Sequence, residues 1–411
     1  MKKFITHSFA HLCCFLCLLT LFSASAESQW VQSGLSNRFS NAFASNSSNL
    51  YAGTDSGMFR SVDNGASWTD INSALPRVWD GVILTRGTDL FMGTAPNLGA
   101  NVGSDIGDVY RSTNNGASWS KTNLAKGDVS ALLMSGSNLF AGVDGIVSGT
   151  GGVYLSTNNG TSWTSASTGL VGTRVSALVA IGTSLFAGTD KGVSVSTNNG
   201  TTWDARGLTT ALVSSFLVSG SNLFAGTSGH GIYLSTNNGA NWNLARTGMP
   251  AATYVTSLAA SGANLFAGAG DGVYISTNNG SSWSLINTGL SANAVGSVGP
   301  VAVSGLNLFL GSVGLWKRPL SDFGGSSVSA RVAESLTIEL SPNPTHGIVQ
   351  VHGLPAGARV EVMNILGENV TNISGVGSSD RAVDLSSFSA GTYFIRISSA
   401  GSTTTKMVVK D

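Results

Sequence analysis

The sequence predicts an all-β protein with a long, repetitive first part and a small β-sandwich at its end. Three observations support this fold class. The chain of 411 residues has 53 glycines and only 10% charged residues, which is unlike a helix-rich or a highly charged disordered chain. A ten-residue motif recurs through most of the chain. The end of the chain lacks this motif and shows short stretches in which apolar residues alternate with polar ones.

The first 26 residues have the three parts of a secretory signal peptide. Lys2 and Lys3 precede an apolar run from Phe9 to Phe22, and small residues follow, so we expect cleavage after Ala26. The apolar run is short for a membrane span. No later segment is longer and equally apolar, so no transmembrane segment is expected in the mature chain.

Cysteine and charge content exclude several kinds of function. Cys13, Cys14 and Cys17 all lie in the predicted signal peptide, so the mature chain has no disulfide, thiolate metal site or cysteine nucleophile. Removal of Lys2 and Lys3 from the 21 basic residues leaves 19 against 21 acidic ones. The basic residues are few and scattered, which excludes a nucleic-acid surface, and no cofactor is predicted.

The recurrent motif, for example YLSTNNGTSW at Tyr154 to Trp163, occurs six times with tryptophans spaced by 51, 44, 40, 39 and 41 residues. Each repeat has four short runs of β-branched and aromatic residues, bounded by Gly, Asn, Asp and Ser. A period near 40 with four strands per repeat predicts a β-propeller, in which each blade is a four-stranded antiparallel sheet.

Two counts together predict seven blades. A second-strand motif, LFAG or a variant of it, occurs seven times, starting at Leu50, Leu90, Leu139, Leu185, Leu223, Leu265 and Leu308. The Trp motif occurs only six times, but QWVQSGL at Gln29 to Leu35 matches SWSLINTGL at Ser282 to Leu290. We therefore expect this N-terminal strand, with Trp30, to pair beside Trp316 and close the ring.

The pattern S-x-[DN]-x-G-x-x-W resembles the Asp-box of BNR-repeat propellers, which include sialidases, sortilin-type receptors, some glucanases and photosystem II assembly factors. The resemblance covers residues 27–319 and implies a seven-bladed β-propeller. In these families the box lies between the third and fourth strands of a blade, away from the usual binding face. The matching positions here are Asp63, Asn114, Asn158, Asn198, Asn237 and Asn278, with Trp68, Trp119, Trp163, Trp203, Trp242 and Trp283.

We expect a structural role for these boxes. The Asn-Gly pair supplies a turn that needs positive φ, the Ser and Asx side chains can bond backbone amides, and the Trp packs on neighbouring strands. Five of the six boxes have Asn where Asp63 has a carboxylate. A carboxylate with catalytic or metal-binding duties could not be exchanged for an amide so freely.

The repeat is broken on the opposite side of the predicted sheets. The loop between the second and third strands is long in two adjacent blades, as GTAPNLGANVGSDIGDVY and GVDGIVSGTGGVY, and long loops commonly carry specificity. The segment LPRVWDG nearby lies outside the repeat pattern. The candidate ligand-binding residues are Arg77, Trp79, Asp80, Asn97, Asn101, Asp105, Asp108 and Asp144.

A tryptophan beside Asp and Asn side chains suits a sugar or a peptide, although Trp79 could instead pack beneath the loop.

A second interpretation concerns the aspartates of the loops between second and third strands, which could form a ring of carboxylates that attracts a cation. Turn propensity explains these residues without a ligand, and no metal site is predicted. The residues of this ring would be Asp55, Asp105, Asp108, Asp144, Asp190 and Asp271.

Catalytic residues are scarce in the predicted propeller. Between Ser28 and Ala333 there is no glutamate, and His230 is the only histidine, in a Gly-rich turn typical of a hairpin. The Tyr and Glu pair that a sialidase resemblance requires is therefore absent. We expect a secreted or cell-surface protein that binds a glycan or a protein, without catalytic residues. The alternative is an extracellular glycoside hydrolase, sialidase- or glucanase-like, with atypical catalytic residues such as aspartates.

After the propeller, residues 320–335 form a Gly/Ser-rich linker and residues 336–411 a separate domain. Alternating apolar residues, such as Val349 with Val351 and Val360 with Val362, predict short strands in a small Ig-like sandwich.

This last domain resembles the type A C-terminal sorting domain of the type IX secretion system of Bacteroidetes. The matching parts are Pro342-Asn343-Pro344 before Gly347, the NILGENV hairpin, Asp384-Leu385-Ser386, Gly391-Thr392-Tyr393 and the end from Lys406 to Lys410. The resemblance implies export first by the Sec pathway and then by the type IX machinery, which becomes a partner of this domain. The protein is thus expected outside the cell or on its surface.

Overall fold

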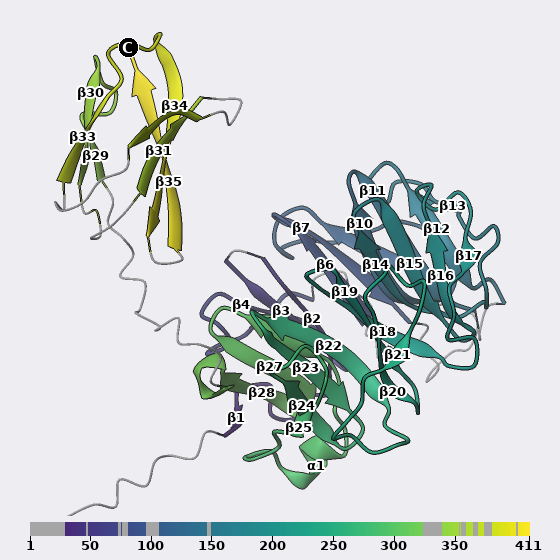
Figure 1. Cartoon of the computed structure of the whole chain (residues 1–411). Coiled ribbons are helices and arrows are strands. Elements are labelled where there is room, and N and C mark those ends of the chain that lie inside the picture. The colour runs from purple at the N-terminus through teal and green to yellow at the C-terminus, as the bar shows by residue number, and fades with distance from the viewer. Residues whose placement is uncertain are drawn as a thin grey trace, which may run out of the picture. The chain divides into compact units, whose positions relative to one another are not determined.

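The computed structural model describes residues 29–46, 48–72, 75, 81–95, 107–145, 149–323, 339–352, 354, 359–364, 369–373, 380–399 and 402–411. The chain divides into two compact units, Met1–Phe323 and Gly324–Asp411 (Figure 1). The expected all-β fold is confirmed, because the described residues form strands with two short helical elements, α1 (Ala292–Val295) and η1 (Leu320–Phe323). The predicted signal peptide lies outside the described residues.

Among the described residues, the strands of the first unit form seven four-stranded antiparallel sheets. Sheets 1 to 4 are, in order, β2 (Ser40–Ser45), β3 (Leu50–Thr54), β4 (Gly57–Ser61) and β5 (Thr69–Asp70); β6 (Gly81–Arg86), β7 (Asp89–Thr94), β8 (Val109–Ser112) and β9 (Ser120–Lys121); β10 (Asp128–Ser135), β11 (Asn138–Asp144), β12 (Gly152–Ser156) and β13 (Thr164–Ser165); β14 (Val175–Ile181), β15 (Ser184–Thr189), β16 (Gly192–Ser196) and β17 (Asp204–Ala205). Sheets 5 to 7 are β18 (Val213–Ser219), β19 (Asn222–Thr227), β20 (Gly231–Ser235) and β21 (Asn243–Leu244); β22 (Val255–Ser261), β23 (Asn264–Ala269), β24 (Gly272–Ser276) and β25 (Ser284–Leu285); β26 (Val301–Ser304), β27 (Asn307–Ser312), β28 (Gly314–Pro319) and β1 (Val31–Gln32).

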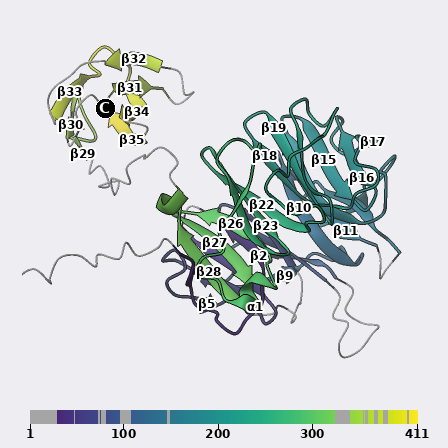
Figure 2. The same ribbon diagram turned by 60° about the horizontal axis from the view of Figure 1, so that its bottom comes forward.

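The seven sheets follow one another around a ring. The first strand of each sheet contacts the first strand of the next, and β26 and β27 of sheet 7 contact β2 of sheet 1 (Figures 1 and 2). The second strands are buried along almost their whole length, because both of their faces pack on neighbouring sheets. This arrangement is that of a β-propeller.

The N-terminal strand completes sheet 7. β1 pairs antiparallel with β28, so that Val31 lies opposite Lys317 and Gln32 opposite Trp316. Trp30 is 2% exposed and its backbone N–H donates to the carbonyl oxygen of Thr288 at 2.9 Å. The pairing expected from the match to the repeat is confirmed, and it joins the beginning of the ring to its end.

The second unit is a small sandwich of two antiparallel sheets. One consists of β29 (Glu339–Ser341), β30 (Ile348–His352) and β33 (Asp380–Asp384), and the other of β32 (Asn369–Ile373), β31 (Arg359–Met363), β34 (Gly391–Ser399) and β35 (Ser402–Lys410). Val349 and Val351 of the first sheet and Val360 and Val362 of the second are fully buried in one hydrophobic cluster. The alternation seen in the sequence therefore marks the inner faces of both sheets.

Candidate functional site

Each box forms the turn between the third and fourth strands of its sheet. In sheet 3, Ser156 Oγ donates to Asn158 Oδ1 at 2.9 Å, and the backbone N–H of Gly160 donates to Ser156 Oγ at 2.8 Å. Asn158 Oδ1 also accepts from the backbone N–H of Ser162 at 2.9 Å. The same three contacts recur around Asn114, Asn198, Asn237 and Asn278.

The geometry of the boxes explains why Asp and Asn are interchangeable in them. Asp63 Oδ1 accepts from Ser61 Oγ at 2.7 Å and from the Ser67 N–H at 2.9 Å, while Oδ2 accepts from Ser67 Oγ at 2.6 Å. In sheet 3 the equivalent Asn158 Nδ2 donates to Ser162 Oγ at 2.9 Å. A hydroxyl group can donate or accept, so it suits either side chain. Hydrogen bonds from Ser67 and Ser61 hold the pKa of Asp63 well below its usual value.

The indole N–H groups of Trp30 and of the six box tryptophans tie each sheet to the one before it. The donor and acceptor pairs, 2.7 to 3.2 Å apart, are Trp30 and Ile286 O, Trp68 and Ser33 O, Trp119 and Ile71 O, Trp163 and Thr122 Oγ1, Trp203 and Ala166 O, Trp242 and Arg206 O, and Trp283 and Ala245 O. The Ser hydroxyl and Asx Oδ1 groups of the boxes and the indole N–H groups are therefore engaged within the protein, on the face of the ring that we call the box face.

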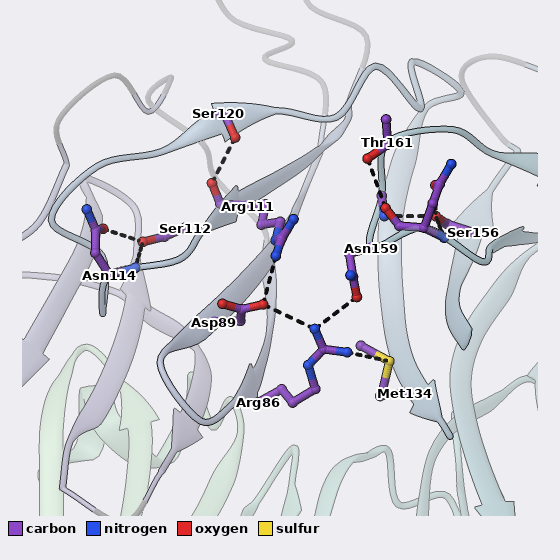
Figure 3. A network of polar contacts seen from close by, with 12 residues as sticks. Arg86, Asp89, Arg111, Ser112, Asn114, Ser120, Met134, Ser156, Asn159 and Thr161 are labelled. Carbon is purple, nitrogen blue, oxygen red and sulfur yellow. Dashed lines mark hydrogen bonds and ion pairs between the residues drawn. The ribbon is translucent and has the colours of Figure 1, made fainter. Parts of the chain in front are cut away.

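A polar network on the box face links sheets 2 and 3 (Figure 3). Arg86 Nη2, at the end of β6, donates to Asp89 Oδ2 at 3.2 Å and to Asn159 Oδ1 of the sheet 3 box at 2.9 Å. Arg111 Nη2 of β8 donates to the same Asp89 oxygen at 2.9 Å. One carboxylate thus joins two guanidinium groups. This network has a weak signal in the sequence, because the hairpin that carries Arg86 and Asp89 is charged where most other repeats have Ser and Asn.

The opposite edge of each sheet carries the loop between the second and third strands, and Asp108 lies at the end of the long loop of sheet 2. The side chain of Asp108 is 1% exposed, and its Oδ1 accepts from the backbone N–H groups of Val109 at 2.7 Å and Leu124 at 2.8 Å. Lys121 Nζ lies 3.5 Å from Oδ2. Asp108 therefore fixes the backbone around it, and its carboxylate does not face solvent.

The two ends of this loop are bonded to each other. The backbone N–H of Thr94 donates to the carbonyl oxygen of Asp108 at 2.9 Å, and the Asp108 N–H donates to Thr94 Oγ1 at 3.0 Å. The two ends of the long loop, at Thr94 and Asp108, are therefore held together by hydrogen bonds at the edge of sheet 2.

Asp144, at the start of the long loop of sheet 3, is paired with an arginine that the sequence did not single out. Arg174 Nε donates to Asp144 Oδ2 at 2.9 Å. Arg174 is itself held by the next sheet, because Asp190 Oδ1 accepts from the backbone N–H groups of Thr173 at 3.1 Å and Arg174 at 3.2 Å. Arg174 lies in a connection of ordinary repeat length, so nothing in the spacing marks it.

The bases of the two long loops meet on one short segment between sheets 2 and 3. Thr150 Oγ1, in the sheet 3 loop, donates to the carbonyl oxygen of Lys126 at 2.5 Å. Gly107, at the end of the sheet 2 loop, lies so close to Gly127 that a Cβ on it would be 2.3 Å from the Gly127 oxygen. The structure therefore brings both loop bases to Lys126 and Gly127.

The other candidate ligand residues, Arg77, Trp79, Asp80, Asn97, Asn101 and Asp105, lie outside the described residues. Among the described aspartates of the tight loops, Asp190 and Asp271 bond to separate partners, and Asp55 Oδ1 is buried without a hydrogen-bond partner. Asp271 Oδ2, for example, accepts from the Tyr274 hydroxyl at 2.6 Å, and burial together with this carboxylate raises the pKa of Tyr274. Within the part of the chain that the structure describes, no group of three or more His, Cys, Asp or Glu side chains could hold a metal ion.

Two parts of the chain match known families. Residues 339–411 match the family described as a secretion system C-terminal sorting domain, and residues 146–247 match the DUF6242 beta propeller domain. Among curated proteins, none matches the sequence of the chain.

Solved propeller structures are similar to this chain at low sequence identity. The extracellular domain of BT4673 from B. thetaiotaomicron is 16% identical with a TM-score of 0.58, over 86% of this chain and 48% of that one, so the chain spans about half the length of that structure. The GH74 xyloglucanase from Xanthomonas campestris is 16% identical with a TM-score of 0.56, over 72% and 54% of the two chains. YCF48 bound to D1 peptide is 14% identical with a TM-score of 0.52, over 71% and 96%. These similarities show the fold alone.

The sorting domain indicates export to the cell surface or the extracellular space, and it implies interaction with the secretion machinery. Among the residues that the structure describes, no helix is long and apolar enough to cross a membrane. The protein is a β-propeller that carries, at residues 339–411, the C-terminal sorting domain of the type IX secretion system.

Proposed function

We propose that the exported propeller binds an extracellular glycan or protein, without catalysis, through the face opposite the box face at sheets 2 and 3. The observation that carries this proposal is the meeting of the two long loop bases at Lys126 and Gly127. Two loops that depart from the ring at one place can contact one ligand together. Loops of this kind, on a rigid frame, are where propellers usually place recognition.

The loop bases are held by hydrogen bonds to other groups of the protein. Asp108 is buried with two backbone N–H donors, and Thr94 closes the base of its loop. On the neighbouring sheet, Asp144 is paired with Arg174. A binding surface that is ordered in advance loses less conformational entropy when it binds, which favours affinity.

The proposed contacts to the ligand come from the side chains of the loops and of the adjacent connection. Trp79 would stack on an apolar face of the ligand, and Arg77, Asp80, Asn97, Asn101 and Asp105 would supply hydrogen bonds. Asp108 and Asp144 act as positioning residues, because each is bonded to groups of the protein.

Binding is favoured over hydrolysis because the carboxylates of Asp108 and Asp144, the two candidates that the structure describes, are bonded to other groups of the protein. Two-carboxylate glycoside hydrolysis needs an acid and a base or nucleophile that flank the substrate. Asp108 is buried with backbone donors, and Asp144 is ion-paired with Arg174. Neither is placed to transfer a proton to a bound sugar.

The test uses the mature chain, residues 27–411, on an oligosaccharide array and on a peptide array, followed by affinity measurement with the strongest probe. Trp79→Ala is expected to weaken binding at least about tenfold, the equivalent of about 1.4 kcal/mol. Leu244→Ala is the control, since Leu244 is 51% exposed on β21 of sheet 5, away from the loops.

Two results would contradict the proposal. One is that the wild-type chain binds nothing on either array. The other is that it releases product from chromogenic glycosides and loses this activity in Asp105→Asn, which would make the protein a hydrolase.

A further inference from the structure

The face opposite the box face has one position at which the repeats differ in chemistry while their backbone is the same. This position immediately precedes the residue at which the register of the first strand shifts in sheets 1, 3, 4, 5 and 6; in sheet 3 it also pairs, with Asp144. We call its occupants the strand-start residues; they are Phe39, Asp128, Arg174, Leu212 and Tyr254.

The positions that follow are nearly constant. In sheets 3 to 6 the next residue is always a valine, and these valines are at most 1% exposed: Val129, Val175, Val213 and Val255. The residue after the valine is Ser or Thr, at a β-bulge in every case. Bulges commonly redirect side chains next to functional sites.

The backbone of the strand-start residues is held between two loops. The carbonyl oxygen of Tyr254 accepts from the N–H of Gly270 in its own sheet at 2.9 Å, and Tyr254 forms a β-bridge with Ser228 of the preceding sheet. Arg174 is held in the same way by Asp190 at 3.1 Å and by a bridge to Asp144.

This combination of fixed backbone and varied side chain points to recognition. Residues that every sheet needs for packing recur in the repeat, as the buried valines do. A position that holds Phe, Asp, Arg, Leu or Tyr has no common packing role. Its carbonyl oxygen nevertheless accepts a hydrogen bond from the loop between the second and third strands in four of the sheets, those of Phe39, Arg174, Leu212 and Tyr254. It lies on the face where propeller loops usually bind ligands.

Tyr254 is the most exposed of these five residues, at 60%, and it is the only aromatic among the large exposed hydrophobic residues that the structure describes. Its ring passes beside Gly229, where a Cβ would be 3.9 Å from the ring atoms Cε2 and Cζ. A large aromatic ring is therefore left open to solvent next to a residue without a side chain.

The connection that carries Tyr254 is held by several hydrogen bonds. Arg246 Nη1 donates to the carbonyl oxygens of Pro250 and Ala251. Thr253 Oγ1 donates to the Pro250 oxygen at 2.7 Å, and the Thr253 carbonyl accepts from Gly231 N at 3.1 Å. The exposed ring is thus presented on an ordered support, as a preorganised contact requires.

Polar groups of both signs surround this position. Ser228 and Gly270, which bracket Tyr254, are close in sequence to His230 and Asp271, and both of these are exposed. Arg246, whose guanidinium group donates to the carbonyl oxygens of Pro250 and Ala251 in the same connection, supplies the positive charge. A ligand with a strong net charge would meet a like charge on this face, whereas a neutral ligand with many hydroxyl groups would not.

We propose that Tyr254 is a stacking platform for a pyranose ring of a neutral glycan. Ser228, His230 and Asp271, whose Oδ2 also accepts from the Tyr274 hydroxyl, would be hydrogen-bond partners of the sugar hydroxyl groups. The apolar face of a sugar ring matches the exposed tyrosine ring, and the carboxylate, imidazole and hydroxyl groups match its edge. This inference rests on the proposed function, since it names the glycan as the ligand, and it adds a contact at sheets 5 and 6.

The experiment measures binding of the mature chain to an array of neutral, sialylated and sulfated oligosaccharides and of peptides. The variants are Tyr254→Ala, Tyr254→Leu and Tyr254→Trp, with Leu244→Ala as a control of similar exposure on β21. Melting temperatures confirm that each variant is folded, and the exposed position of Tyr254 makes this the expected result. Tyr254→Leu keeps apolar bulk but removes the flat ring.

We expect the wild-type chain to bind neutral oligosaccharides, and both Tyr254→Ala and Tyr254→Leu to bind them at least about tenfold more weakly. Tyr254→Trp and Leu244→Ala should stay close to the wild type. Neutral-glycan binding that survives Tyr254→Ala but not Trp79→Ala would overturn this inference and leave the proposed function intact. Binding of charged oligosaccharides or peptides alone would overturn the ligand class, and binding to no probe would overturn both proposals.

Discussion

The indole nitrogen of Trp30 donates a hydrogen bond to the carbonyl oxygen of Ile286 at 2.7 Å, although 256 residues separate the two in the chain. Box tryptophans make the same contact between consecutive sheets, as Trp283 does with Ala245 at 2.9 Å. Trp30 therefore gives sheet 7 the inter-sheet bond that no box supplies there. Closure of the ring depends on this strand.

Trp30→Ala is expected to lower the free energy of unfolding by about 3–5 kcal/mol, because a buried indole is lost and the Ile286 carbonyl loses its donor. Chemical denaturation of the mature chain measures this change. Val31→Ala, on the same strand but with Val31 44% exposed, should change stability by less than about 0.5 kcal/mol. Equal effects of the two substitutions would contradict a specific closing role for Trp30.

Substitution of Gly200 tests how closely a box packs against the preceding sheet. It has φ +81°, and a Cβ on it would lie 2.8 Å from Cε1 of Phe140 in β11. Gly182 has φ +57° with no atom within 4 Å of such a Cβ. We expect Gly200→Ala to destabilise by about 2–4 kcal/mol, from backbone strain and overpacking, and Gly182→Ala by about 1 kcal/mol, from strain alone. Thermal unfolding of both variants checks this; a Gly200→Ala effect no larger than that of Gly182→Ala would refute the steric explanation.

The carboxylate of Asp63 is expected to make the stability of its box depend on pH, which the amide side chains of the Asn boxes cannot do. Hydrogen bonds from Ser67 and Ser61 lower the folded-state pKa of Asp63 below the unfolded-state pKa. The resulting stabilisation is fully present above the unfolded-state pKa, about pH 4, and is lost as pH falls toward the folded-state pKa. The melting temperature of the wild type should therefore fall, relative to Asp63→Asn, as the pH drops below about 4.

The reciprocal exchange Asn158→Asp is the matched control, because Ser156 and Ser162 provide the same donors to a carboxylate. It should acquire the acid dependence that Asp63→Asn loses. Parallel melting curves for all three proteins between neutral and acidic pH would show that the box carboxylate has no such role.

Asp108 and Asp144 should differ in their contribution to stability. Asp108→Ala leaves the buried N–H groups of Val109 and Leu124 without an acceptor, at about 1–3 kcal/mol each. Asp144→Ala removes an ion pair whose Arg174 side chain is 36% exposed, so a loss below about 1 kcal/mol is expected. Denaturation with urea compares the two variants. Similar losses of unfolding free energy would contradict a stabilising role for the hydrogen bonds from Val109 and Leu124 to Asp108.

The box contacts and the strand order could be predicted because they are local and repeated. Asn158 bonds residues within four positions of itself, and the same letters recur at the same spacing in each repeat. The partner of β28 could be predicted for the same reason, since the sequence around Trp30 matches the start of a fourth strand.

Contacts between different repeats could not be predicted in this way. The long loops were recognisable from their length, but their meeting at Lys126 and Gly127 depends on how adjacent sheets are inclined. The pairing of Asp144 with Arg174 and the network around Asp89 also join residues of different sheets or strands. The position of Asp108 in the repeat gave no sign of its burial.

The sequence by itself determined the all-β class, the repeated sheet, the strand that completes sheet 7 and the sorting domain, because each depends on short-range patterns that repeat or match as a whole. Only the tertiary structure decided which side chains are buried and hydrogen-bonded, such as Asp108, and which are exposed on a hydrogen-bonded connection, such as Tyr254. The physical reason is that exposure and partnership depend on atoms brought close by the curvature of the ring.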